Sequence, residues 1–160
     1  MSQKSPAPRL PRALTLPLSL LPDKLHGAVA AATLHRVFAA QRAGGELDFM
    51  DGKTTHIRVL DAGVCLRLTL GEKGFAVDDS GESPDLLVQG TAYDYLLLLS
   101  GDEDPDTLFF QRRLRMSGDT ALGVHLKNFL ASAEPGSLPL FALAVPLLQR
   151  GMRWFERVLG

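Results

Sequence analysis

The stretch from Val64 to Leu70 (VCLRLTL) constrains the fold more than any other part of the chain. Apolar residues occupy every second position, and a cysteine, an arginine and a threonine lie between them. Because successive side chains of a β-strand point to opposite faces, this alternation predicts a strand with one apolar face. Turn sequences flank it at 61–63 and 71–74. The chain must therefore contain a sheet that turns one face toward a core.

Further strands are predicted on both sides of this one. Short apolar runs lie at 56–59, 75–77 and 85–90, with turn residues such as Asp51-Gly52 between them, and Leu47 with Phe49 suggest another strand. A late strand is expected within LFFQRRLRM, ending before Gly118. Links this short favour antiparallel pairing. The sequence thus predicts a mainly antiparallel sheet of about five strands.

Three longer segments have the spacing of helices. The first begins at Asp23, which we expect to cap it, and ends at Gly44-Gly45. Its expected buried face consists of Leu25, Val29, Ala32, Val37 and Phe38. The second runs from Thr91 to Ser100, with Asp94 completing a capping box. The third begins at Asp119 and should turn inward Leu122, Leu126, Phe129 and Leu130. Pro105 is expected to open a short helical turn as well. Together these elements predict an α+β domain with helices on one face of the sheet.

The distribution of prolines and apolar residues suggests three parts. Residues 1–22 hold five prolines and are expected to be a leader rather than a core element. Residues 23–136 should form the folded domain. Residues 137–160 form a tail, in which Pro139 and Pro146 interrupt an apolar run too short to span a bilayer.

Charge is separated along the chain although its formal sum is only −1. Residues 1–42 carry six basic and one acidic residue, residues 43–137 carry eight and sixteen, and residues 138–160 carry three and one. The balance gives no indication of nucleic-acid binding. Basic ends of this kind either meet an anionic surface or are simply solvated.

No set of residues predicts catalysis or metal binding. Cys65 is the only cysteine, which excludes an internal disulfide, and the motifs of metalloproteases, phosphate-binding loops and serine hydrolases are missing. His56, Arg58, Cys65 and Arg67 should share one sheet face, which leaves a cysteine nucleophile as a weak alternative. We therefore expect no enzyme activity, no cofactor and no metal.

Two features admit more than one interpretation. Arg112, Arg113 and Arg115 either prevent unwanted pairing of an exposed edge strand or bind phosphate. The many apolar side chains either fill the core or leave a cavity for an apolar ligand. In the tail, Leu148, Met152, Phe155 and Leu159 oppose a basic face that includes Arg150 and Arg153, with Trp154 near the boundary. This pattern suits a membrane interface, packing on the same domain or contact with a second subunit.

The order of elements and one long string carry a family resemblance. Residues 25–133 resemble the sterol-carrier-protein type 2 lipid-binding domain, in which a late strand leads through Gly-Asp into a final helix. The string DPDTLFFQRRLRMSGDTALGVHLKN, the ELDFMDGK hairpin and the Pro-rich leader are similar to the bacterial UbiT-like branch of ubiquinone biosynthesis accessory factors.

The resemblance implies a non-enzymatic protein that holds a lipid, such as an isoprenoid quinone precursor or a phospholipid, between sheet and helices. The alternative is an interaction scaffold without lipid. The implied partners are lipid and other proteins of oxygen-independent ubiquinone biosynthesis, with a location in the cytoplasm at the inner membrane. The alternatives left open for the tail add the membrane surface and a second copy of the chain as partners. Expected membrane contacts are Arg150, Arg153, Trp154 and Phe155. The residues expected to line the lipid cavity are Phe49, Leu66, Leu68, Phe75, Leu98, Phe109, Phe110, Leu114, Leu122, Leu126 and Phe129.

Overall fold

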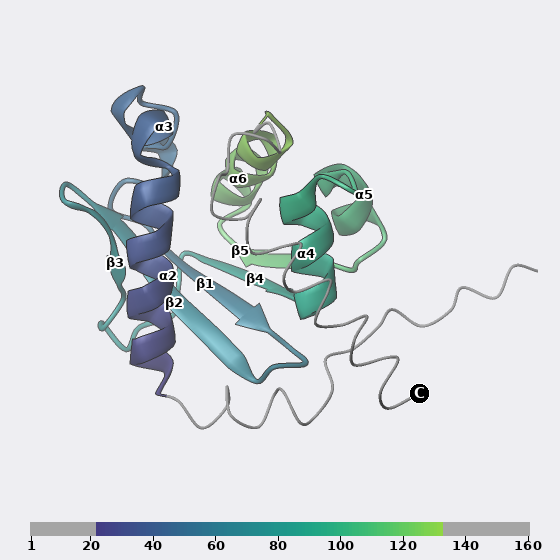
Figure 1. The fold of residues 1–160 in the computed structure, drawn as a ribbon, viewed down its shortest axis with the longest axis horizontal. Coiled ribbons are helices and arrows are strands. Elements are labelled where there is room, and N and C mark those ends of the chain that lie inside the picture. Colours follow the sequence, from purple (N-terminus) through teal and green to yellow (C-terminus); the bar gives the residue numbers. More distant parts are fainter. Residues whose placement is uncertain (1–21, 133–160) are drawn as a thin grey trace, which may run out of the picture.

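The computed structural model describes residues 22–132, which form five strands and several helices (Figure 1). The strands are β1 (Thr54–Val59), β2 (Val64–Gly71), β3 (Gly74–Val77), β4 (Leu86–Gly90) and β5 (Arg115–Gly118). The helices are α2 (Asp23–Val37), α3 (Ala39–Ala43), α4 (Ala92–Ser100), α5 (Pro105–Phe110) and α6 (Thr120–Ser132), with a 3-10 turn η1 (Asp48–Met50). The predicted leader up to residue 21 and the predicted tail lie outside the described residues.

The strand order is β3-β2-β1-β4-β5. Three neighbouring pairs are antiparallel, whereas β1 and β4 run parallel. The parallel pair arises because β3 ends at Val77, in the same row as Thr55 near the start of β1, so the connection runs across the sheet and β4 starts beside the start of β1. The predicted five-strand α+β fold is confirmed, and the sheet is mixed rather than purely antiparallel.

The two long helices, α2 and α6, pack on the same face of the sheet. The register places Leu68, Thr55 and Leu86 in one row on neighbouring strands. A Cβ at Gly27 of α2 would lie 3.3 Å from Val77, which pairs with Leu68 at the β3 end of that row. At the other end, α6 approaches Leu86. The face that carries this row is therefore the inner face, as the alternation in β2 predicted.

The core is one continuous cluster between this inner face and the helices. Its buried members are Val37, Phe38, Leu47, Met50, Leu70, Leu86, Val88, Leu122 and Phe129. The rings of Phe38 and Phe129 meet edge to face, with their centroids 5.4 Å apart. This contact joins the junction between α2 and α3 to α6 above the sheet and contributes beyond the area it buries.

The predicted buried face of α2 is right at its C-terminal end, where Val37 and Phe38 are buried, and wrong along the rest of the helix. Gly27, Ala31 and Val37 are buried, whereas Leu25 and Val29 are 48% and 62% exposed. The reason is that small residues let the helix approach the sheet closely, and this outweighs the larger side chains on its other face. The N-cap prediction was also wrong, because Pro22 is the N-cap and Asp23 lies in the first turn.

Two predicted strand segments are helical. Leu47 and Phe49 belong to the segment around η1, and the strand expected from residue 108 onward is α5 until Phe110. Asp104 caps α5 by accepting a hydrogen bond from the Thr107 amide at 3.2 Å, and Pro105 occupies its first turn. This capping overrides the strand propensity of the phenylalanines, so β5 begins only at Arg115.

The other predicted caps are confirmed. Thr91 and Asp94 form the reciprocal capping box of α4. The Asp119 carboxylate accepts a hydrogen bond from the Leu122 amide at 3.0 Å and so caps the first turn of α6. These local interactions fix where α4 and α6 leave the sheet.

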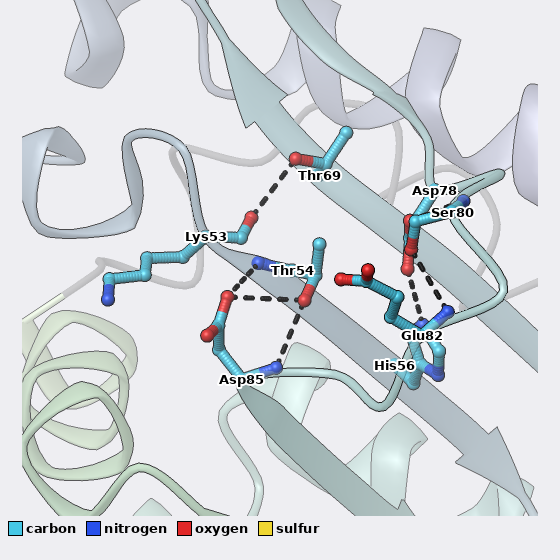
Figure 2. A network of polar contacts seen from close by, with 8 residues as sticks. All are labelled: Lys53, Thr54, His56, Thr69, Asp78, Ser80, Glu82 and Asp85. Atoms are coloured by element: carbon cyan, nitrogen blue, oxygen red, sulfur yellow. Dashed lines mark hydrogen bonds and ion pairs between the residues drawn. The ribbon is translucent and has the colours of Figure 1, made fainter.

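Hydrogen bonds on the outer face hold the β3–β4 connection against the sheet (Figure 2). His56 Nε2 lies 2.8 Å from Asp78 Oδ2, and both side chains are buried. Asp85 Oδ2 accepts a hydrogen bond from the Thr54 amide at 2.8 Å, and the Asp85 amide donates to the Thr54 hydroxyl at 3.0 Å. Both ends of the connection are thereby fixed to β1.

Candidate functional site

A groove of about 610 Å³ lies between β5, α5 and the first half of α6. Its apolar lining is Leu86, Phe109, Leu114, Met116 and Val124. Polar and charged residues complete it, namely Arg112, Arg115, Ser117, Asp119, Thr120 and Lys127, together with Gly118 and Gly123. The groove thus combines an apolar lining with cationic side chains, as a site for an amphiphilic ligand requires.

Two glycines hold the walls of the groove together. Gly118 has a φ of +113°, and a Cβ there would lie 2.3 Å from the carbonyl oxygen of Asp85. This permits the Asp119 amide to donate to the same oxygen at 2.7 Å, which fixes the start of α6. A Cβ at Gly123 would lie 3.2 Å from the Met116 sulfur. Helix α6 can therefore lie close to β5 along the groove.

The three arginines of the segment 112–115 have different surroundings. Arg113 contacts Asp94 Oδ1 through Nε at 2.7 Å and Nη2 at 2.5 Å, and its guanidinium lies 5.7 Å from the centroid of the Tyr93 ring. Asp94 is buried in the α4 capping box, so Arg113 has a structural role. Arg112 and Arg115 line the groove and form no ion pair within residues 22–132. Of the three arginines of this segment, Arg112 and Arg115 are the ones available to a ligand.

A second hollow of about 540 Å³ adjoins the groove. It is lined by Asp106, Thr107, Phe109, Phe110 and Lys127. Phe109 and Lys127 line both hollows, so the two form a continuous surface. Lys127 lies 2.8 Å from Asp106, which neutralises its charge at this boundary. The unpaired positive charge of the groove therefore comes from Arg112 and Arg115.

The predicted cavity residues fall into separate groups. Phe109 and Leu114 line the groove, and Phe110 lines the second hollow. Leu68 is buried on β2, and Leu66 and Leu98 are half-buried. Members of the packed core or its margin are Phe49, Phe75, Leu122, Leu126 and Phe129. The role of all these residues in binding a ligand stays a prediction. Arg150, Arg153, Trp154 and Phe155 lie outside the described residues.

Sequence reasoning missed several residues of the groove. Leu86, Met116, Val124 and Lys127 were not predicted as site residues, although all line it. The spacing of Thr120, Val124 and Lys127 along α6 would have revealed a second helix face beside the buried one. What the sequence does not reveal is that this face borders β5.

The outer face brings together the residues weighed as a possible cysteine site. The register pairs His56 with Arg67 and Arg58 with Cys65, as expected for a shared face. However, the imidazole of His56 contacts Asp78, which anchors the β3–β4 connection (Figure 2). This favours a structural role for His56. Within residues 22–132 no group of three or more potential ligands could hold a metal ion.

The architecture defines a class, namely an α+β domain with an apolar groove that also carries cationic side chains, between the edge strand β5 and helix α6. Comparison of sequences then identifies the family. The SCP-2 sterol transfer family matches residues 32–131, and the chain belongs to this family. The resemblance found in the sequence is thus confirmed.

Relatives of known name come from two kinds of comparison. The chain is 34% identical over 139 residues to the ubiquinone biosynthesis accessory factor UbiT of Escherichia coli K12, covering 87% of this chain and 79% of that protein. The same figures hold for UbiT of Escherichia coli O157:H7. Among solved structures, the ubiquinone synthesis protein UbiJ-SCP2 matches with a TM-score of 0.56 and 17% identity, over 69% of this chain and 93% of that one. This last likeness supports the fold alone.

No helix among residues 22–132 is long and apolar enough to cross a bilayer.

Proposed function

We propose that this protein is a non-enzymatic accessory factor of ubiquinone biosynthesis that holds a lipid in the groove between β5, α5 and α6. Membership of the SCP-2 family and the similarity to proteins named UbiT support this class of function. The observation that carries the proposal is the groove itself. Its apolar lining suits an isoprenoid or acyl chain, and Arg112 and Arg115 suit a polar or anionic head.

The proposed cargo is an isoprenoid quinone precursor or a membrane lipid. Each methylene group buried contributes roughly 0.8 kcal/mol, so a chain of several carbons binds usefully without polar recognition. Loose selectivity among such chains follows. The proposed setting is the oxygen-independent branch of the pathway, in the cytoplasm at the inner membrane. There the residues 137–160 would contact the bilayer through Arg150, Arg153, Trp154 and Phe155, and other proteins of the pathway would be the partners.

The proposal is tested by blocking the groove. Val124 lines it from α6 and is 47% exposed, so Val124→Trp should obstruct the groove and change stability by no more than about 0.5 kcal/mol. Val29→Trp is a matched control, because Val29 is an exposed valine on α2, remote from the groove lining. Native mass spectrometry of the full chain should find co-purified lipid in the wild type and the control, and little in Val124→Trp. Lipid-free wild type, or equal lipid in all three, would contradict the proposal.

A second candidate function is an interaction scaffold without bound lipid. It is favoured by the packing of several predicted cavity residues against one another, for example Phe49 and Phe129 with centroids 6.2 Å apart. On this hypothesis the partner proteins bind equally well to the wild type and to Val124→Trp. Lipid in the wild type that Val124→Trp loses, together with reduced partner binding, would exclude it.

A further inference from the structure

Phe110 is the most exposed large apolar side chain in the described part of the chain, at 90%. It is the last residue of α5 and lines the second hollow beside the groove. Leaving an aromatic ring in water forgoes the free energy that its burial would contribute. Phe109, its neighbour, is half-buried and borders both hollows. The exposed ring therefore stands at the margin of the proposed lipid site.

The turn after Phe110 has an unusual residue at its centre. Arg112 has a φ of +57°, and it is the only residue other than glycine with a positive φ in the described segment 22–132. Its amide donates to the Phe109 carbonyl at 3.0 Å, and the Arg113 amide donates to the Leu108 carbonyl at 3.0 Å. This is the Schellman ending of a helix, in which glycine normally occupies the left-handed position. An arginine here accepts backbone strain that a glycine would avoid.

The charges around this turn are only partly neutralised. Arg113 is paired with Asp94 and Lys127 with Asp106, whereas Arg112 and Arg115 form no ion pair within residues 22–132. Two other carboxylates in this part of the molecule serve as helix caps: Asp104 accepts from Thr107, and Asp119 accepts from Leu122. Two cationic side chains are thus left to face solvent beside an exposed aromatic ring.

We propose that Phe110, Arg112 and Arg115, here called the α5 corner, dock onto an anionic bilayer. Phe110 enters the interface and the two arginines contact lipid phosphates. A fluid interface accepts an isolated ring without a matching pocket, and its negative charge complements the unpaired arginines. The inference rests on the proposed function, since docking here would bring the groove to the membrane that contains its cargo. It differs from the predicted tail contact, because it lies within the folded domain.

The experiment measures binding of the full chain to vesicles. Sedimentation with phosphatidylcholine vesicles, with and without phosphatidylglycerol, gives a partition coefficient for each variant. Phe110→Ser should lower the partition coefficient about tenfold. Arg112→Gly and Arg115→Gln should each lower it about fivefold, and only with vesicles that contain phosphatidylglycerol. Leu60→Ser and Arg36→Gln are matched controls, since Leu60 is 52% exposed and Arg36 is exposed elsewhere on the surface. Both controls should leave the partition coefficient unchanged.

Arg112→Gly separates docking from folding. Glycine relieves the left-handed strain, so thermal unfolding of this variant should occur at the same temperature or higher. Loss of vesicle binding in a protein at least as stable as the wild type supports the α5 corner. Unchanged binding of Phe110→Ser and Arg112→Gly, or an equal loss in the control variants, overturns the inference.

The outcome is independent of the test of the groove. Lipid retained by the wild type but lost from Val124→Trp supports the proposed function whether or not the α5 corner docks. A wild type that carries lipid but shows no corner-dependent vesicle binding refutes only the docking inference. A wild type without lipid refutes the proposed function itself, and vesicle sedimentation then reports on the corner alone.

Discussion

The inner face of the sheet is built differently toward its two edges, which are β3 on the closed side and β5 on the open side. On the closed side, α2 packs over β2 and β3, and Arg42 donates hydrogen bonds to the carbonyls of Gly71 and Glu72 in the β2–β3 turn. On the open side, α6 stands beside β5 and leaves a groove with an exposed Phe110 at its margin. The closed side has the features of a stable core, whereas the open side keeps apolar surface and positive charge available. We therefore expect substitutions on the closed side to reduce stability most and substitutions on the open side to reduce binding most.

The largest expected loss of stability comes from creating a cavity on the closed side. Leu70 of β2 is 1% exposed, so Leu70→Ala should lower the free energy of unfolding by about 3 kcal/mol. Met116→Ala, on the half-buried open side, should cost only about 1 kcal/mol because the site borders a groove. Chemical denaturation of both variants measures the difference. Equal losses would mean that the open side is packed as tightly as the closed side.

An effect of intermediate size is expected from the β3–β4 connection, which begins at Asp78. Hydrogen bonds from His56 and Ser80 lower the pKa of Asp78 to about 2. Asp78→Asn should cost about 2 kcal/mol at neutral pH, since it replaces a charge-assisted hydrogen bond. Because the folded-state pKa is depressed, the stabilisation is complete above the unfolded pKa near 3.8 and is lost as pH falls through about 2.

Urea denaturation across this pH range measures the difference between wild type and Asp78→Asn. The difference should be constant above about pH 5 and shrink steadily below pH 4. Asp85 is present in both proteins, and the backbone hydrogen bond from Thr54 lowers its pKa in each, so most of its contribution cancels; the Asp78 charge, which raises the pKa of Asp85, is the smallest of its causes. A difference that grows on acidification would show that the buried contact does not favour the ionised carboxylate.

The smallest effect is expected from the surface of the closed side. Lys24 lies 3.5 Å from Asp79, and both side chains are well exposed. Lys24→Ala should change the free energy of unfolding by less than about 0.5 kcal/mol, because solvent and salt screen such pairs. Thermal unfolding at low and high salt checks this. A loss comparable to that of Leu70→Ala would show that charge, rather than packing, holds α2 in place.

Much of the fold could be predicted because its determinants are local. The alternation in β2, the Thr91–Asp94 capping box and the Asp119 cap each depend on residues close together in the sequence. The parallel pairing of β1 with β4 could not be predicted in this way, since it depends on the path of a connection across the sheet. The buried face of α2 was predicted correctly only at Val37 and Phe38, for a related reason. Large apolar side chains indicated one face, but contact with the sheet selected Gly27 and Ala31.

The candidate site was predictable only in part. Phe109 and Leu114 were proposed from the sequence because they lie in the segment that carries the family resemblance. Both line the groove. Val124 and Leu86 come from elements that meet only in the folded chain, so no local pattern marks them. The different surroundings of Arg112 and Arg113 likewise depend on the long-range contact with Asp94.

Photo-crosslinking tests most directly whether the open side holds the lipid. The full chain would be loaded with a farnesyl phenol that carries a diazirine, irradiated and digested, and the modified peptides identified by mass spectrometry. We expect adducts within 109–127, where α5, β5 and α6 surround the groove, and their loss in Val124→Trp. Adducts confined to α2, β2 and β3, or unchanged by Val124→Trp, would contradict this assignment.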